Sequence, residues 1–142
     1  MSQAIDQKIA SWLEGNFDAA TKDEIRSLQA NQPDMLQDAF YRNLEFGTGG
    51  LRGIMGVGTN RINKYTIGMA TQGFANYLNK TYPNDKISVV VGHDSRNNAR
   101  FFAETTAEVF AANGIKVYLF EALRPTPELS FAIRSLGAKA GV

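Results

Sequence analysis

The 142-residue chain is long enough for one domain with a buried core, and 44% hydrophobic with 20% charged residues is the composition of an ordinary globular protein. Fifteen Lys and Arg against 14 Asp and Glu give a net charge of +1, which provides no general attraction to nucleic acid or to an acidic membrane. Without cysteine there is neither a disulfide nor a thiolate metal site. We see no secretory signal and no apolar stretch of about 20 residues, so we expect a cytoplasmic protein.

Three helices are expected in the first part of the chain. The apolar residues of 5–13 repeat at helical spacing. Thr21 and Glu24 form the T-x-x-E pattern of a capping box, which predicts that the second helix opens at Thr21. Pro33 can begin a third helix, because a proline loses nothing at the first helical position. We interpret residues 1–44 as an N-terminal helical arm.

Glycine dominates the next segment, with six glycines among the twelve residues 47–58. A helix is expected to resume near Asn63. Gly68 and Gly73 fall inside it, where each costs roughly 1 kcal/mol relative to alanine. The explanation we favour is close packing of this helix against another element.

After this helix the periodicity changes to that of buried strands, which are expected at 87–91, 115–120 and 138–142, with helices over 98–113 and from 126 onward. This order predicts parallel strands with right-handed crossovers. The fold class is α/β: a three-layer α/β/α sandwich with a mostly parallel, mixed sheet, preceded by the helical arm. The glycine-rich segment is a candidate for an antiparallel edge strand. The expected core contains Ile67, Phe74, Leu78, Val89, Val91, Phe102, Val109, Phe110, Val117, Leu119 and Ile133.

Ligands of parallel α/β sheets gather beyond the carboxyl ends of the strands. His93, the only histidine, follows the first expected strand; an acid–base role is open, but we favour a loop hydrogen bond. Asp94 and Arg96 can pair, and we slightly favour a salt bridge that braces the loop. Arg124 follows the second strand, and we favour a surface arginine at a helix start. No cluster of His or carboxylates has metal-ligand spacing, so no metal is assigned to this chain.

The glycine-rich segment offers a second candidate site. Residues 46–53 read F-G-T-G-G-L-R-G. Glycines let backbone N–H groups approach an anion, and Arg52 could clamp a phosphate. The segment is not a P-loop, because no lysine follows the glycines, and it is not a dinucleotide fingerprint. From composition alone, a structural glycine loop and a phosphate-binding loop stay equally open.

In combination these motifs resemble the α-D-phosphohexomutases, the phosphoglucomutase/phosphomannomutase family. Residues 46–53 resemble the family signature F-G-T-[SAG]-G-[LM]-R-G, and residues 90–96, V-V-G-H-D-S-R, resemble V-V-[IV]-G-x-D-[ST]-R. Residues 58–63 and 123–130 are similar to further family segments. The resemblance covers residues 40–142, and the residues before them resemble the longer bacterial phosphoglucomutases.

The resemblance implies that residues 45–142 are domain I of a four-domain enzyme, truncated before its phosphoserine loop. Such an enzyme is an intramolecular phosphotransferase. It interconverts hexose 1-phosphate and hexose 6-phosphate, with glucose favoured here, through a phosphoserine and a bisphosphorylated sugar. It uses Mg²⁺ and a hexose 1,6-bisphosphate activator. The implied partners are the sugar phosphate and the remaining domains of the same chain, with no nucleic acid and no membrane.

Residue roles also follow from the resemblance. Arg52 matches the arginine that reaches the reacting phosphate; the residues that support it are Thr48, Gly49, Gly50, Asp94 and Arg96. The family's T-[AG]-S-H-N-P motif and its metal loop are absent from this sequence. The nucleophilic serine is therefore not in this chain, no cofactor is expected on it, and we expect it to be inactive alone. Two alternatives stay open: a non-enzymatic α/β anion-binding or regulatory module, and a mutase for phosphopentose or phosphomannose.

Overall fold

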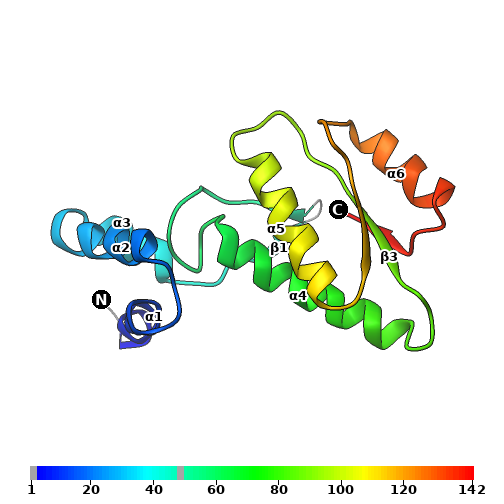
Figure 1. Cartoon of the computed structure of the whole chain (residues 1–142). Coiled ribbons are helices and arrows are strands. Elements are labelled where there is room, and N and C mark those ends of the chain that lie inside the picture. The colour runs from blue at the N-terminus through cyan, green and yellow to red at the C-terminus, as the bar shows by residue number, and fades with distance from the viewer. Residues whose placement is uncertain (1–2, 48–49) are drawn as a thin grey trace. The chain divides into compact units, whose positions relative to one another are not determined.

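The computed structural model describes residues 3–47 and 50–142, and the chain forms two compact units, Met1–Thr66 and Ile67–Val142 (Figure 1). The first unit holds three helices and a glycine-rich segment, and the second holds the three-stranded sheet with its helices. The division at residue 44 that the sequence suggested stays a prediction.

The helices of the first unit are α1 (Gln3–Glu14), α2 (Ala19–Asn31) and α3 (Pro33–Phe40). They form because each presents apolar residues at helical spacing, and these residues pack into one core. The members of this core are Ile5, Ile9, Trp12, Ile25, Leu36, Ala39, Phe40 and Val57. Trp12 lies among aromatic rings: Phe17 stacks on it at 4.4 Å between ring centroids, and Phe40 meets it edge-on at 5.4 Å. The three helices predicted for this part of the chain are confirmed, with Pro33 opening the third.

The predicted start of the second helix is wrong. The helix begins at Ala19, and Asp18 is its N-cap: the Asp18 Oδ1 accepts a hydrogen bond from the Thr21 N–H at 2.8 Å. Thr21 therefore lies in the first turn, and its hydroxyl donates to Asp18 Oδ2 at 3.1 Å. The Asp18 carboxylate, three residues before Thr21, accepts the free N–H of the first turn. The T-x-x-E pattern therefore does not cap this helix.

Asp18 also joins the start of α2 to the start of α4 (Lys64–Thr81). Its Oδ2 lies 2.7 Å from the Lys64 ammonium and accepts a hydrogen bond from the Tyr65 hydroxyl at 2.6 Å. The Asp18 backbone N–H donates in return to the Tyr65 hydroxyl oxygen at 2.9 Å. The Lys64 ammonium first, and then the Tyr65 hydroxyl and the Thr21 N–H, hold the pKa of the Asp18 carboxyl well below its usual range. Two elements distant in sequence are thus tied through one ionised side chain.

The glycine-rich segment folds as a short hairpin followed by irregular chain. Strands β1 (Phe46–Gly47) and β2 (Gly50–Leu51) pair antiparallel in a two-stranded sheet of their own, so the segment is not an edge strand of the larger sheet. Further along, Gly58 has φ +116°, and a Cβ there would overlap the carbonyl oxygen of Ala39. That oxygen already accepts a hydrogen bond from the Asn60 N–H at 2.9 Å, so glycine is required at this position.

The second unit is the predicted α/β/α layer structure. Its strands are β3 (Ser88–Val91), β4 (Lys116–Leu119) and β5 (Ala140–Gly141), and they pair in the order β4-β3-β5, all parallel. Helix α5 (Ala99–Ala112) packs on β4 and β3, and α6 (Thr126–Ser135) packs on β3 and β5. Figure 1 shows α4 and α5 on one side of the strands and α6 on the other. The three predicted strands are confirmed as neighbours.

The core of this unit lies between the sheet and the α4–α5 layer. It consists of Ala75, Leu78, Ile87, Val89, Val91, Ala103, Phe110 and Ile115. Val90 points to the opposite side of the sheet and is also buried, since successive side chains of a strand alternate between faces. Of the expected core residues, Leu78, Val89, Val91 and Phe110 are buried; the other seven are half-buried. Five of these seven lie on the helices α4, α5 and α6, and Val117 and Leu119 lie on the edge strand β4.

We expected Gly68 and Gly73 of α4 to allow close packing of this helix against another element. For the described residues this explanation is wrong. A Cβ on Gly68 would meet only Val109 Cγ2, at an ordinary 3.9 Å, and a Cβ on Gly73 would meet nothing within 4 Å. Close packing against the residues that the structure describes therefore requires neither glycine.

Within residues 3–47 and 50–142, no helix is both long and apolar enough to cross a lipid bilayer.

Substituting Gly58 by alanine is expected to lower the free energy of unfolding of the first unit by about 3–5 kcal/mol, because the new methyl adds a backbone clash to the strain of a positive φ. Gly56→Ala is the matched control: its φ is +151°, but the nearest atoms to its Cβ lie at 4.0 Å, so strain alone should cost about 1–2 kcal/mol. Urea unfolding followed by the fluorescence of the single tryptophan, Trp12, measures both. Equal losses in the two variants would contradict the clash.

Replacing Asp18 by asparagine is expected to lower the free energy of unfolding by about 1 kcal/mol at pH 7, a modest loss because the Asp18 side chain is 37% exposed and asparagine keeps the helix cap. A lowered pKa stabilises the fold above the unfolded value of about 3.9, and this contribution is lost as the pH falls through the folded value. The gap between wild type and variant should therefore shrink below about pH 4.

Glu14→Gln is the control for this experiment, because within the described residues Glu14 is an exposed carboxylate without an ion pair. Urea unfolding of the three proteins at pH 7 and pH 3 gives the comparison. A loss in Asp18→Asn that is as large at pH 3 as at pH 7 would refute the role of the charge.

Candidate functional site

The first group of predicted site residues lies along the carboxyl edge of the sheet. Because β3 and β4 run parallel with Val91 opposite Leu119, the chain leaves both strands at the same edge. Hydrogen bonds tie the two loops together there: the Phe120 N–H donates to the Val91 carbonyl at 3.0 Å, and the Arg124 N–H donates to the His93 carbonyl at 3.1 Å. The structure thus brings His93, Asp94, Arg96 and Arg124 to one edge of the second unit, as expected.

Gly92, the first residue after β3, lies close to the neighbouring loop at this edge. Its N–H donates to the Val142 carbonyl at 2.8 Å, and a Cβ on it would lie 3.3 Å from the Phe120 ring. A side chain would therefore press against the neighbouring loop, so glycine lets the two loops approach.

Asp94 and Arg96 form a salt bridge with each other within the loop after β3. The Asp94 Oδ1 accepts a hydrogen bond from the Arg96 N–H at 3.1 Å, and its Oδ2 accepts one from Arg96 Nε at 2.7 Å. The backbone N–H of Arg96, and then its guanidinium, lower the pKa of the Asp94 carboxyl. Asp94 is thus ionised at neutral pH. The Arg96 side chain is 86% exposed, and within the described residues its two terminal nitrogens have no partner, which leaves them open to an anion.

The His93 side chain makes a hydrogen bond within its own loop. Its Nδ1 lies 3.1 Å from the Asp94 carbonyl oxygen, and because a carbonyl can only accept, this contact assigns the proton to Nδ1. In the neutral ring, Nε2 then carries a lone pair. Nε2 is buried and has no hydrogen-bond partner among the residues that the structure describes, so His93 keeps the capacity to accept one more hydrogen bond.

Arg124 is occupied by local contacts at the start of α6. Its Nε lies 3.0 Å from Glu128 Oε1, and its Nη1 donates to the Leu123 carbonyl at 2.9 Å. This is the surface arginine at a helix start that we favoured, and the geometry offers little of its guanidinium to a ligand.

Sequence reasoning missed Arg100, which organises the same edge. Its Nη1 donates to two carbonyls of the loop after β4, Phe120 at 3.0 Å and Glu121 at 2.9 Å, while its Nε pairs with Glu104 at 2.7 Å. The spacing of Arg100 and Glu104 by four residues in an expected helix was the available signal. The contact with the loop after β4 requires the tertiary fold, because it joins residues about twenty positions apart.

The second group of predicted residues lies in the first unit. Thr48 and Gly49 fall outside the described residues. Gly50 has φ +113° and pairs with Gly47 across the hairpin, and Arg52 follows the hairpin as an exposed residue. Among the described residues Arg52 has no hydrogen bond and no ion pair. Its guanidinium is therefore available to a phosphate without first breaking a contact.

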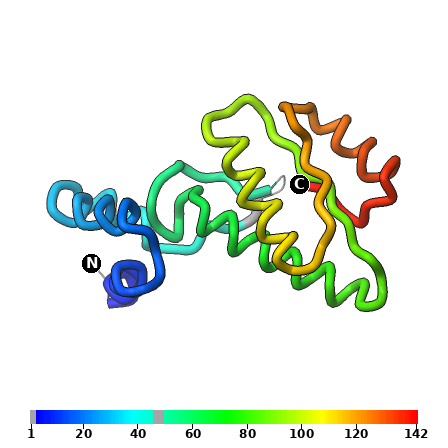
Figure 2. Tube along the Cα trace, viewed as in Figure 1, coloured from blue at the N-terminus to red at the C-terminus, as the bar shows by residue number. Residues whose placement is uncertain are grey.

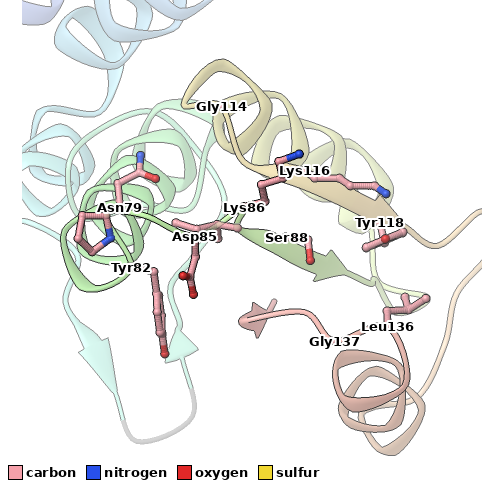
Figure 3. Close-up of a pocket in the computed structure, with 12 residues that line it drawn as sticks. Asn79, Tyr82, Asp85, Lys86, Ser88, Gly114, Lys116, Tyr118, Leu136 and Gly137 are labelled. Carbon is pink, nitrogen blue, oxygen red and sulfur yellow. The ribbon is translucent and has the colours of Figure 1, made fainter.

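A pocket among the described residues lies elsewhere. Its volume is about 740 Å³, and it opens at the amino-terminal edge of the sheet, opposite the motif residues. Figure 3 shows Tyr82 and Asp85 on one side of the start of β3, with Lys116 and Tyr118 on the other. None of the candidate site residues lines it, so it is not the site that the motifs indicate.

Comparison with known proteins gives a match to a family model. Residues 43–142 match the model described as phosphoglucomutase/phosphomannomutase, alpha/beta/alpha domain I. This range contains every candidate residue of both groups.

Three relatives illustrate the similarity. A probable phosphoribomutase of Schizosaccharomyces pombe is 38% identical over 100% of this chain and 24% of its own length. A phosphopentomutase of Mus musculus is 35% identical over 100% of this chain and 24% of its own length. A phosphoglucomutase of Staphylococcus aureus is 42% identical over 75% of this chain and 19% of its own length. The chain thus spans about a quarter or less of these relatives. No solved structure gives a significant match.

Proposed function

Because this chain belongs to the phosphoglucomutase/phosphomannomutase family, we propose that it supplies domain I of an enzyme that moves a phosphoryl group between two positions of a sugar phosphate. The observation that carries the proposal is the match of residues 43–142 to the family's first domain. The three relatives described above are all named as phosphomutases. The remaining domains of the intact protein would complete the active site, and the non-enzymatic alternative is not favoured.

The proposed substrate is a hexose phosphate, converted between its 1- and 6-phosphates through a phosphoserine and a bisphosphorylated intermediate. Glucose is the favoured sugar, and the 42% identity to a phosphoglucomutase supports it. A second candidate is a pentose phosphate, because the relatives that match the whole chain are named phosphoribomutase and phosphopentomutase. The family resemblance assigns sugar recognition to domains outside these residues.

Arg52 is the residue of this chain to which we assign contact with the transferring phosphoryl group. Transfer breaks the bond between phosphorus and the serine oxygen and forms a bond to a sugar oxygen, while negative charge is spread over the three other phosphoryl oxygens. A guanidinium is always charged and offers two parallel donors to such oxygens. Its exposure and its position after the Gly50 turn support this role. Thr48 and Gly49 are proposed to present it.

The sheet edge is assigned a supporting role. The Asp94–Arg96 pair fixes the loop after β3 and leaves the terminal nitrogens of Arg96 directed to solvent. In a parallel α/β sheet this edge is where ligands gather. We propose that the pair braces the loop at this edge of the sheet for phosphate binding in the intact enzyme, and that Arg96 adds positive charge there.

Mg²⁺ and a hexose 1,6-bisphosphate are the proposed cofactors of the intact enzyme. The residues described here do not fit a metal, because among them no group of three or more His, Asp or Glu side chains could hold one. A magnesium ion would offset phosphate charge from a site on another domain, and the roles given to Arg52, Asp94 and Arg96 do not depend on it.

In the intact enzyme, Arg52→Ala is expected to slow single-turnover transfer from the phosphoenzyme by about 100-fold or more, with a much smaller effect on binding of the sugar phosphate, because the guanidinium stabilises charge that grows in the transition state. Arg26→Ala is the control, since Arg26 is an exposed arginine that pairs with Asp23 on α2, and its transfer rate should not change. A raised KM with an unchanged transfer rate in Arg52→Ala would overturn the assigned role.

The 142-residue chain alone is expected to show no turnover, because its sequence has no S-H-N-P motif to carry the phosphoryl group. The assay compares the purified chain with the intact protein, using glucose 1-phosphate or ribose 1-phosphate with the bisphosphate activator and Mg²⁺. The intact protein should convert glucose 1-phosphate, and a preference for ribose 1-phosphate would select the second candidate. Turnover by the chain alone, or none by the intact protein with either sugar, would refute the proposal.

A further inference from the structure

A chemically reactive pair of residues lies outside both groups of candidate site residues. Asn113 is the only asparagine of the sequence that is followed by a glycine. In such a pair the backbone nitrogen of the glycine can attack the side-chain carbonyl carbon of the asparagine, because the glycine has no Cβ to obstruct the approach. The pair lies at the end of α5, where Gly114 is exposed and Asn113 is half-buried. Water therefore has access to the bonds that would react.

Hydrogen bonds to α4 and to α5 itself hold the side-chain amide of Asn113. Its Nδ2 donates to Gln72 Oε1 at 2.8 Å, and its Oδ1 accepts from Gln72 Nε2 at 2.8 Å. The same Nδ2 donates to the Val109 carbonyl, one turn back in α5, at 2.8 Å. Figure 2 traces α4 beside α5 on one side of the strands. The two amides thus join the helices, and any rotation of the Asn113 side chain breaks these hydrogen bonds.

The backbone nitrogen that would attack is also held. The Gly114 N–H donates to the Ala111 carbonyl at 3.0 Å, and Gly114 has φ +74°, the left-handed conformation with which a glycine commonly ends a helix. Asn79 of α4 donates from Nδ2 to the Asn113 backbone carbonyl at 3.3 Å. All of these contacts are made at a helix end, which opens more readily than a helix interior. The fold therefore slows the reaction without removing it.

We propose that Asn113 is a site of spontaneous deamidation, and that its pairing with Gln72 of α4 sets the rate. When the pair opens and the Gly114 nitrogen gives up its proton to solvent, this nitrogen bonds to Asn113 Cγ. The bond between Cγ and Nδ2 breaks, and Nδ2 takes up a proton and leaves as ammonia, so a cyclic imide remains. Water then adds to either carbonyl of the imide and opens the ring to aspartate or isoaspartate. This inference does not depend on the proposed mutase activity.

The product weakens the contact between α4 and α5. A carboxylate at position 113 has no donor for Gln72 Oε1 or for the Val109 carbonyl, and it places a negative charge at the C-terminal end of α5, where the helix dipole is also negative. Asn113→Asp reproduces the aspartate product and is expected to lower the melting temperature of the second unit, measured by calorimetry, by about 2–8 °C. An unchanged melting temperature would show that the amide pair does not hold the two helices together.

Mass spectrometry of one tryptic peptide measures the reaction at this site alone. Trypsin releases residues 101–116, because Arg100 precedes this segment and Lys116 ends it. Asn113 is the only residue of the peptide with a side-chain amide, so a mass gain from the exchange of –NH2 for –OH reports its deamidation. Gln72→Ala removes the partner amide. Met69→Ala is the matched control, because Met69 is exposed on the same helix and makes none of the hydrogen bonds to Asn113 described above.

We expect the folded wild-type chain to deamidate about tenfold or more slowly than the same chain in urea, because the reaction requires local opening. Folded Gln72→Ala should react about threefold or more faster than the wild type, since one set of restraining hydrogen bonds is gone, and folded Met69→Ala should react at the wild-type rate. Circular dichroism checks that both variants stay folded, and in urea all three proteins should react equally. A folded Gln72→Ala no faster than Met69→Ala, or an unfolded wild type that does not deamidate, would overturn the proposal.

Discussion

The second unit depends on β3 being paired on both sides. β4 and β5 both hydrogen-bond to it in parallel, and Val89, Val90 and Val91 are almost completely buried on its two faces. A parallel strand has its backbone groups satisfied only when neighbours lie on both edges, and its apolar side chains need a helical layer on each face. The positions of α5 and α6 follow from this requirement, because each covers one face of the central strand.

This central strand also decides where chemistry can occur. The loops after β3 and β4 must emerge together, and backbone hydrogen bonds from Phe120 and Arg124 hold them side by side. Gly92 and Gly141 are small because neighbouring groups come close: a Cβ on Gly141 would lie 2.5 Å from Ile133 of α6. The position of the sheet edge that carries Asp94 and Arg96 therefore depends on the close packing of the elements behind it.

The first unit is organised around an ionised carboxylate and an aromatic cluster. Asp18 caps α2 and at the same time binds Lys64 and Tyr65, while the Tyr65 ring packs against Trp12 and Phe17. The Asp18 side chain thus connects the N-cap of α2 to the aromatic core through Tyr65. The hairpin that precedes Arg52 belongs to the same unit.

The sequence by itself determined the element order, the parallel three-stranded sheet and the residues of the phosphohexomutase motifs, because apolar periodicity and short motifs are local properties of the chain. It also predicted the Asp94–Arg96 pair, whose members lie two positions apart. Only the tertiary structure decided that Asp18 and not Thr21 caps α2, since a carboxylate held by Lys64 from far along the chain is already at the helix end. The same holds for Arg100, whose carbonyl partners come from the loop after β4. Gly73 shows the remaining gap: a glycine is visible in the sequence, but whether anything packs against it is known only when every neighbour has been placed.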